Sequence, residues 1–214
     1  MTGLWLLQLQ IGLCLFLLCQ AGIRRAGFPV RLSAITGIVL AGCILFTGIP
    51  VGDLSVAQWV AGFSPGCSIP LLAVLTHGTI RSWGGPSLFR SADLRSLWIL
   101  GLGLGLILYP ASLGWGSWDP YAEGWERSGL FPGVGLVAAG LILFGFRSGY
   151  VLLAAVFAWR LGALESSNYW DYLVDPQFFL VALIGLTMAL FPSSRAGRGT
   201  AAQSEKGGIF SGAR

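Results

Sequence analysis

The sequence predicts an all-α integral membrane protein, a bundle of helices that crosses the bilayer several times. Of its 214 residues, 55% are hydrophobic and only 10% are charged, and the mean hydropathy is +0.75. A soluble domain carries about 25% charged residues, so this chain has too little polar surface to cover its apolar mass. The 32 glycines lie between long apolar runs, a pattern typical of closely packed membrane helices.

Seven apolar stretches are long enough, or nearly so, to cross the hydrocarbon core, which takes about 20 residues with a range of about 17–25. They are residues 4–22, 32–50, 56–80, 97–113, 129–146, 148–164 and 176–191. We therefore expect a seven-helix transmembrane domain over residues 1–191. A flexible, polar tail over 192–214 should follow, because its small and polar residues cannot form a core.

The first two stretches are continuous. Residues 4–22 follow no basic residue but precede Arg24 and Arg25, which reverses the charge order of a cleaved signal peptide. This order predicts an amino terminus on the outer side of the membrane. Residues 32–50 form the second apolar run, which ends at Pro50.

The third stretch, residues 56–80, is interrupted around Pro65. Broken spanning helices often line the substrate sites of transporters, because unwound backbone must face protein or water. The same pattern also fits a short interfacial helix capped by Asp53 or Ser55 and followed by a short span. In a six-crossing alternative, residues 53–80 are interfacial or re-entrant.

The later stretches indicate where helices begin and end. Arg147 alone separates residues 129–146 from 148–164. One fused helix would bury this charge in the membrane at a cost of roughly 2.5–3.5 kcal/mol, so we expect a tight hairpin. Residues 176–191 follow Asp175, and an aspartate before a proline is a typical helix N-cap.

Three stretches carry small residues four positions apart, a spacing that lets helix backbones approach closely. The pairs are Gly37 and Ala41, Gly101 and Gly105, and Gly135 and Ala139. Packing within the bundle explains these pairs, and association with a second copy or another membrane subunit is the sharper interpretation.

Charge placement predicts the orientation, because cytoplasmic loops collect Lys and Arg. With seven crossings and an outer amino terminus, the inner segments hold eleven of the thirteen basic residues, and the outer segments hold seven of the nine acids. Without a crossing at 56–80, Arg81, Arg90 and Arg95 would face outward instead. We expect a bacterial cytoplasmic (inner) membrane, with the carboxyl terminus in the cytoplasm.

Two outer loops, residues 114–129 and 165–177, combine carboxylates with aromatic residues. Trp and Tyr concentrate at membrane interfaces, which explains this composition without a site. Alternatively, the loops form a shared outer cleft that holds a sugar or a cation, and carboxylate pairs can also act as acid and base. The candidate substrate-binding residues are Trp118, Glu123, Glu126, Glu165, Trp170 and Asp171.

His77 is the only histidine, and it shares a helical face with Arg81, four residues later, near the inner boundary. Interface anchoring explains the pair, and a phosphate or lipid-headgroup site is the alternative. A lone histidine cannot supply a multi-histidine metal cluster or a pair of haem ligands. The four cysteines also lack C-x-x-C spacing, so we expect neither a metal nor a cofactor.

No P-loop, H-E-x-x-H, G-x-S-x-G or Rossmann fingerprint occurs, and no acid lies near the middle of an expected span. We therefore expect a non-enzymatic accessory, scaffold or assembly subunit of a larger membrane complex, in contact with lipid, other subunits or its own copies. Nucleic-acid binding is not expected, because the arginines lie scattered between apolar runs. The alternative is a small transporter or a lipid- or glycan-handling membrane enzyme, with its site between the broken third stretch and the acidic-aromatic loops.

Overall fold

The computed structural model describes residues 4–26, 33–63, 66–125 and 129–191. Regular structure in these residues is helical, as predicted, except for one small hairpin in which β1 (Pro50–Val51) pairs antiparallel with β2 (Leu54–Ser55). The hairpin turns at Gly52, whose φ of 68° favours glycine. Glu126 and the predicted tail over 192–214 lie outside the described residues.

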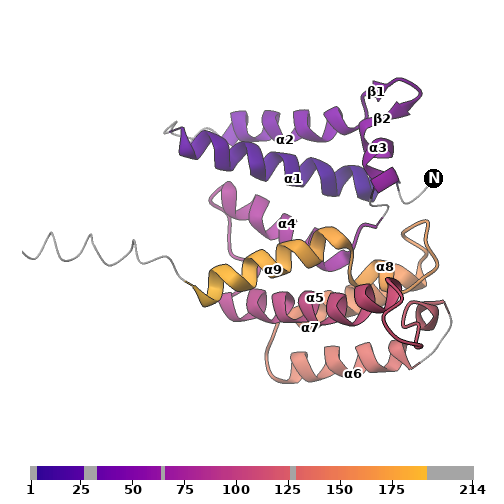
Figure 1. Ribbon diagram of the computed structural model, residues 1–214. Helices are drawn as coiled ribbons and strands as arrows, with labels where there is room; N and C mark the ends of the chain where they lie inside the picture. The colour runs from indigo at the N-terminus through magenta and orange to yellow at the C-terminus, as the bar shows by residue number, and fades with distance from the viewer. Residues whose placement is uncertain (1–3, 27–32, 64–65, 126–128, 192–214) are drawn as a thin grey trace, which may run out of the picture.

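The helices lie side by side with their long axes roughly aligned, so that successive long helices run in opposite directions (Figure 1). Their bounds are α1 (Leu4–Arg25), α2 (Ser33–Thr47), α3 (Val56–Phe63), α4 (Ile69–Ser82), α5 (Ser91–Ser112), η1 (Ala122–Gly124), α6 (Leu130–Leu143), α7 (Ser148–Arg160), α8 (Trp170–Leu173) and α9 (Pro176–Leu190). α1 packs on α2 and α4, α4 on α7, α6 on α7, and α5 on α9.

A close helix contact joins α5 to α9 through the predicted G-x-x-x-G face. A Cβ atom on Gly101 would lie 2.6 Å from Cε1 of Phe178, and one on Gly105 would lie 2.2 Å from Cδ2 of Phe179. Only glycine permits this approach. This face is therefore used inside the bundle, in agreement with the packing interpretation.

The other two small-residue faces point away from the bundle. A Cβ atom on Gly37 in α2, or on Gly135 in α6, would meet no atom within 4 Å among the described residues. Ala41 and Ala139 are also exposed. These faces are open to lipid or to another helix.

The predicted break divides the third stretch into two helices. α3 begins with a reciprocal cap, in which the Gln58 N–H donates to Ser55 Oγ (3.3 Å) and the Ser55 N–H donates to Gln58 Oε1 (2.7 Å). α4 follows with Pro70 in its first turn. The structure therefore has a short helix with Ser55 as its capping residue, followed by α4, and the crossing of the membrane by α4 stays a prediction.

Three helices among the described residues are long and apolar enough to span a membrane, which is fewer than the seven predicted. They are Leu4–Arg25, Ser91–Ser112 and Trp170–Leu190. The apolar helices Ile35–Thr47, Leu130–Leu143 and Ser148–Arg160 are shorter. Gly145 (φ 77°) and Gly162 (φ 61°) follow the last two of these and end them early. The turn around Arg147 confirms the predicted hairpin.

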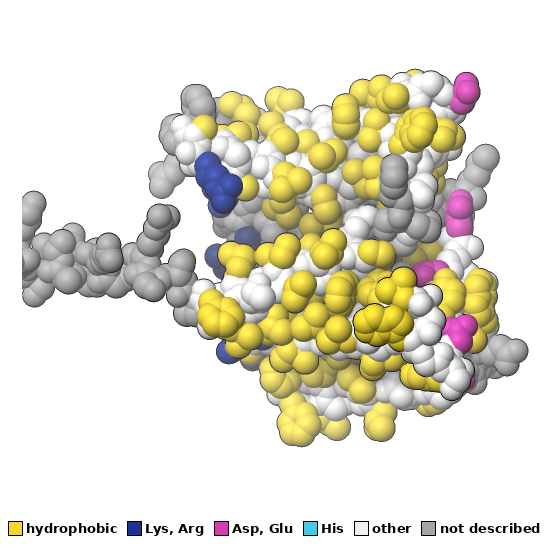
Figure 2. Space-filling view, viewed as in Figure 1, with side chains coloured by type: hydrophobic (Ala, Val, Ile, Leu, Met, Phe, Trp, Pro, Cys, Tyr) yellow, Lys and Arg dark blue, Asp and Glu magenta, His cyan; other side chains and the backbone are white. Residues whose placement is uncertain are grey.

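Charged side chains gather at opposite ends of the bundle, with an apolar belt between them (Figure 2). The basic end is formed by the last turns of α1 and α4, the first turns of α5 and the α6–α7 turn, which carry Arg24, Arg25, Arg81, Arg90, Arg95 and Arg147. The acidic end is formed by the β1–β2 hairpin, η1 and the loops around α8, which carry Asp53, Asp119, Glu123, Glu165 and Asp171.

Candidate functional site

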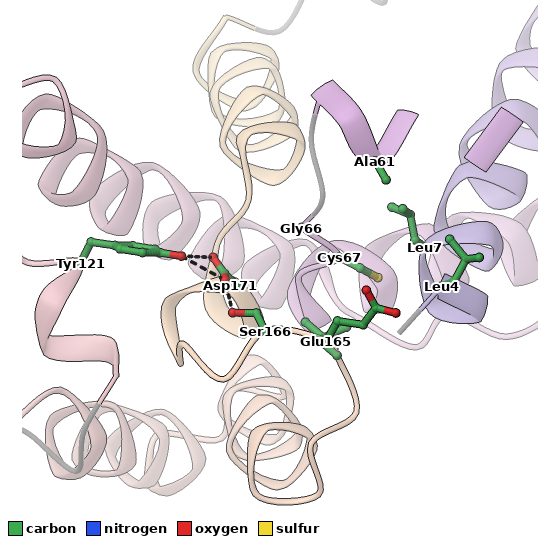
Figure 3. A pocket seen from close by; sticks show the side chains of 10 residues that line it. Leu4, Leu7, Ala61, Gly66, Cys67, Tyr121, Glu165, Ser166 and Asp171 are labelled. Atoms are coloured by element: carbon green, nitrogen blue, oxygen red, sulfur yellow. Dashed lines mark hydrogen bonds between the residues drawn. The ribbon is translucent and has the colours of Figure 1, made fainter. Parts of the chain in front are cut away.

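A cavity of about 200 Å³ opens at the acidic end, where α1 begins, α3 ends and the loop before α8 approaches the segment before α4 (Figure 3). One part of its wall is apolar and the rest carries oxygen atoms. The lining residues are Leu4, Leu7, Ala61, Gly66, Cys67, Tyr121, Leu164, Glu165, Ser166 and Asp171. The cavity thus adjoins the break in the third stretch, since Gly66 and Cys67 follow that break directly.

The Asp171 carboxylate is the best-fixed polar group of this cavity. The Tyr121 hydroxyl donates to it, with O···O distances of 3.2 and 3.3 Å. The Ser166 hydroxyl also donates to it, so two side chains from separate loops hold the carboxylate in place (Figure 3). Burial and the nearby Asp171 charge raise the pKa of Tyr121 to about 12, so its phenol stays a hydrogen-bond donor at neutral pH.

The two aromatic-acidic loops are tied together by buried hydrogen bonds. Asn168 is fully buried; its Nδ2 donates to the Tyr121 carbonyl (2.9 Å), and its Oδ1 accepts from the Trp170 N–H (2.9 Å). Trp170 Nε1 donates to the Pro120 carbonyl (2.7 Å). A Cβ atom on Gly124 would lie 1.9 Å from Asn168 Oδ1, so only glycine fits there. These contacts hold Tyr121 over Asp171.

The structure separates the predicted residues of the outer loops. Glu165 and Asp171 line the cavity. Trp170 is 3% exposed and supports the loops from within, whereas Trp118 is 61% exposed and lies outside the cavity. Glu123 is exposed on η1 and does not line the cavity either. Glu126 lies outside the described residues.

Asp175 fixes the inner side of the cavity and confirms the predicted cap of the last helix. It is 2% exposed, and its Oδ1 accepts from the Phe178 N–H of α9 (2.5 Å). Its Oδ2 accepts from the Ser68 N–H (2.7 Å), just before α4. A Cβ atom on Gly66 would lie 3.0 Å from Asp175 Cβ, so the non-helical segment packs tightly on this residue.

A second cavity, of about 580 Å³, lies at the basic end between the last turn of α4 and the first turn of α5. Its lining residues are His77, Gly78, Arg81, Ser87, Phe89, Arg90, Ser91 and Leu94. The predicted pair, His77 and Arg81, therefore lies in one cavity, together with a second arginine and two serines that the sequence did not single out.

The described residues contain no cluster of three or more His, Cys, Asp or Glu side chains that could hold a metal ion. At the acidic end, Glu165 and Asp171 are the ionisable groups of the cavity wall that could bind a cation. No protein-family model, curated protein or solved structure matches this chain. The site geometry is therefore the basis of the functional proposal.

Sequence reasoning missed Tyr121, Ser166 and Asn168. A partial signal for Tyr121 was available, because Asp119 precedes Pro120 and its Oδ1 accepts from the Tyr121 N–H (3.0 Å), a turn that aspartate favours. Asn168 carried a similar local signal, because its Oδ1 accepts from the Trp170 N–H two residues later (2.9 Å). Ser166 bonds Asp171 and the Asn168 N–H within its own loop, but a serine in a polar loop does not by itself indicate a site.

Proposed function

We propose that the chain crosses the membrane seven times, through α1, α2, the α3–α4 pair, α5, α6, α7 and α9. The separation of basic and acidic ends supports this topology, because each additional helix returns the chain to the opposite end (Figures 1 and 2). The basic end then faces the cytoplasm of a bacterial cell, and the amino terminus lies outside. Helices of 13–15 residues, such as α2, α6 and α7, reach only about 20–22 Å, so local thinning of the bilayer accompanies them.

We infer that the cavity at the acidic end binds an amphiphile whose polar head carries an amine. The observation that carries this inference is the divided wall. Leu4, Leu7 and Ala61 offer apolar surface for a chain, and the Asp171 carboxylate offers negative charge for a head. Among the described residues, Arg160 is the basic residue at the acidic end, and it does not line the cavity.

The location of the cavity supports a ligand that comes from the outer leaflet. Its lining residues belong to the acidic end, which in the proposed topology lies where lipid chains meet the outer headgroup region. Tyr121 and Ser166 supply hydroxyl oxygens beside Asp171, so hydroxyl groups of the same head can also be bound. A transporter or a lipid- or glycan-handling protein would use such a cavity, and it would bind the head before moving or modifying it.

Binding of a dansyl-labelled alkylamine to the protein in phosphatidylcholine nanodiscs tests this function. Asp171→Asn should weaken binding about ten-fold or more, because a charged hydrogen-bonding partner is lost. Asp53→Asn is the matched control, since Asp53 is exposed at the same end but does not line the cavity. Equal binding by wild type and Asp171→Asn, or equal weakening by the control, would overturn the proposal. A neutral dansyl-labelled alkanol should bind wild type and Asp171→Asn alike.

An accessory or scaffold subunit of a membrane complex is the second candidate, supported by the open small-residue faces at Gly37 and Gly135. Partner subunits or second copies should then co-purify in mild detergent and be lost from Gly135→Leu. Gly103→Leu is the control, because Gly103 is equally open but stands outside the small-residue pairs. A wild-type protein that is purely monomeric would contradict this candidate.

A further inference from the structure

The cavity at the basic end gathers hydrogen-bond donors from two helices and the loop between them. His77 and Arg81 lie in the last turns of α4, Ser87 in the loop, and Arg90 and Ser91 at the start of α5. Arg81 and Arg90 are cationic and Ser91 carries a hydroxyl group, whereas the Ser87 hydroxyl already donates to the Phe89 carbonyl (2.8 Å). The cavity wall contains no carboxylate among the described residues. This donor set suits an anion.

A hydrogen bond at Nδ1 of His77 leaves its Nε2 as the hydrogen-bond donor. His77 is 9% exposed, and its Nδ1 accepts from the Phe89 N–H (3.2 Å). In a neutral imidazole, one nitrogen accepts and the other carries the proton. The proton is therefore on Nε2, which makes no hydrogen bond among the described residues and is left to donate into the cavity that the ring lines.

Arg90 and Arg81 differ in how many hydrogen bonds they already form within the protein. Arg90 donates from Nε and Nη2 to the buried Asp93 (3.1 Å each) and from Nη2 to the Gly145 carbonyl. Arg81 is exposed, and its one described contact is a long one, from Nη1 to Ser87 Oγ (3.5 Å). Asp93 offsets the charge of Arg90, so Arg81 supplies the uncompensated positive charge of the cavity.

The start of α5 adds to the attraction of an anion. The first N–H groups of a helix carry partial positive charge, and Ser91 opens this 22-residue helix at the cavity wall. Arg147 fixes the loop from outside the cavity, since its Nη1 donates to the Leu88 carbonyl (2.6 Å). The α4–α5 loop, held by Arg147, therefore forms one side of the cavity, and the start of α5 forms the other.

We propose that this cavity binds a phosphate group, with Arg81 as its principal charged partner and with His77 Nε2 and the Ser91 hydroxyl as further donors. The phosphate belongs to an anionic lipid headgroup of the adjacent leaflet or to a soluble phosphate compound. Basic pockets between membrane helices bind such headgroups, and guanidinium groups match phosphate oxygens in geometry as well as charge. The site is independent of the acidic-end cavity.

Two probes separate the sources of phosphate. The purified full-length protein is titrated with inorganic phosphate in a neutral detergent, with sulfate-free buffer, and thermal unfolding is followed. In parallel, it is placed in nanodiscs of phosphatidylcholine alone or with phosphatidic acid, and lipid binding is measured. Arg81→Gln is the test variant. Arg95→Gln is the matched control, because Arg95 is exposed at the same end and on α5 but does not line the cavity.

Loss of one charge-assisted contact should weaken phosphate or phosphatidic acid binding about ten-fold or more in Arg81→Gln, with Arg95→Gln unchanged. A response to inorganic phosphate identifies a soluble ligand, and a response to phosphatidic acid alone identifies a headgroup. Equal weakening by the two variants would show attraction to the whole basic end and would overturn the site. The absence of binding by either probe would also overturn it. Ser91→Ala, which keeps all charges, should weaken binding to a smaller extent.

Discussion

Each end of the bundle contains one buried aspartate that joins helices distant in sequence, and the two are satisfied differently. At the basic end, fully buried Asp93 accepts from the guanidinium and the N–H of Arg90 and from the N–H of Arg147 (2.9 Å). At the acidic end, Asp175 accepts backbone N–H groups from Phe178 and Ser68. No arginine or lysine among the described residues forms an ion pair with it.

This difference shows that the charge separation of the surface extends into the interior. The carboxylate at the basic end is compensated by an arginine, so the remaining arginines keep that end positive. The carboxylate at the acidic end is stabilised by the starts of two helices, whose N–H groups favour negative charge without adding a cation. Asp175 thus brings no cation to the acidic end, which suits an amine ligand there, and the basic end suits a phosphate.

The largest expected effect in this comparison comes from Asp175→Ala. It leaves the N–H groups of Ser68 and Phe178 without a partner, at about 1–3 kcal/mol for each buried donor. The thermal unfolding midpoint in detergent should fall by many degrees. Asp53→Ala, at an exposed position of the same end, should leave it nearly unchanged. Identical midpoints for wild type and Asp175→Ala would remove Asp175 as a link between α4 and α9.

A smaller effect on stability is expected at Asp93, which forms an ion pair with Arg90 and also accepts a hydrogen bond from the Arg147 N–H. Asp93→Ala removes the acceptor of the Arg90 N–H and of the Arg147 N–H. Both bonds are only part-buried, unlike those of Asp175, so stability should fall by less than in Asp175→Ala, by about 1–3 kcal/mol. Arg90→Ala removes an ion pair whose cation is 59% exposed, and such pairs contribute below about 1 kcal/mol. Denaturant titration of the two variants should therefore rank Asp93→Ala as the less stable. The opposite order would mean that the ion pair, rather than the link to the α6–α7 turn, stabilises this end.

The smallest expected effect is a loss of stability at alkaline pH, which depends on the ionisation of Tyr121. Its pKa in the folded protein is raised to about 12, by burial first and by Asp171 second, against about 10 in an unfolded chain. The associated stability is present below pH 10 and is lost as the pH rises towards 12, because the unfolded state ionises first. Asp171→Asn should lower this pKa, which tyrosinate absorbance can measure with Tyr121→Phe as the reference. An unchanged titration would mean that Asp171 does not act on this phenol.

Helices, caps and charged ends could be predicted because they depend on neighbours in the chain. The Asp175 cap, the Arg147 turn and the break before α4 are local features, and each occurs as predicted. Spanning length was predicted less well. Residues 32–50 and 148–164 form helices of 15 and 13 residues, since helix termination depends on turn geometry that apolar composition does not specify.

The residues that line the cavity at the acidic end also could not be predicted from the sequence alone. Sequence composition made Glu123, Glu165 and Asp171 equivalent, because each lies in an aromatic-acidic loop. The fold places two of them on one cavity and leaves Glu123 outside it. Tyr121 enters the site through the Asn168–Tyr121 and Trp170–Pro120 hydrogen bonds, which join positions 47 and 50 residues apart.

Composition and the order of charges along the chain are therefore sufficient for the class of protein and for its two unlike ends. The reason is that partition between lipid and water acts on each segment independently of the others. That the Tyr121 hydroxyl meets Asp171, and that the Arg147 N–H meets Asp93, is set only in the tertiary structure. Those pairings arise from buried hydrogen bonds between distant loops, and no segment can form them alone.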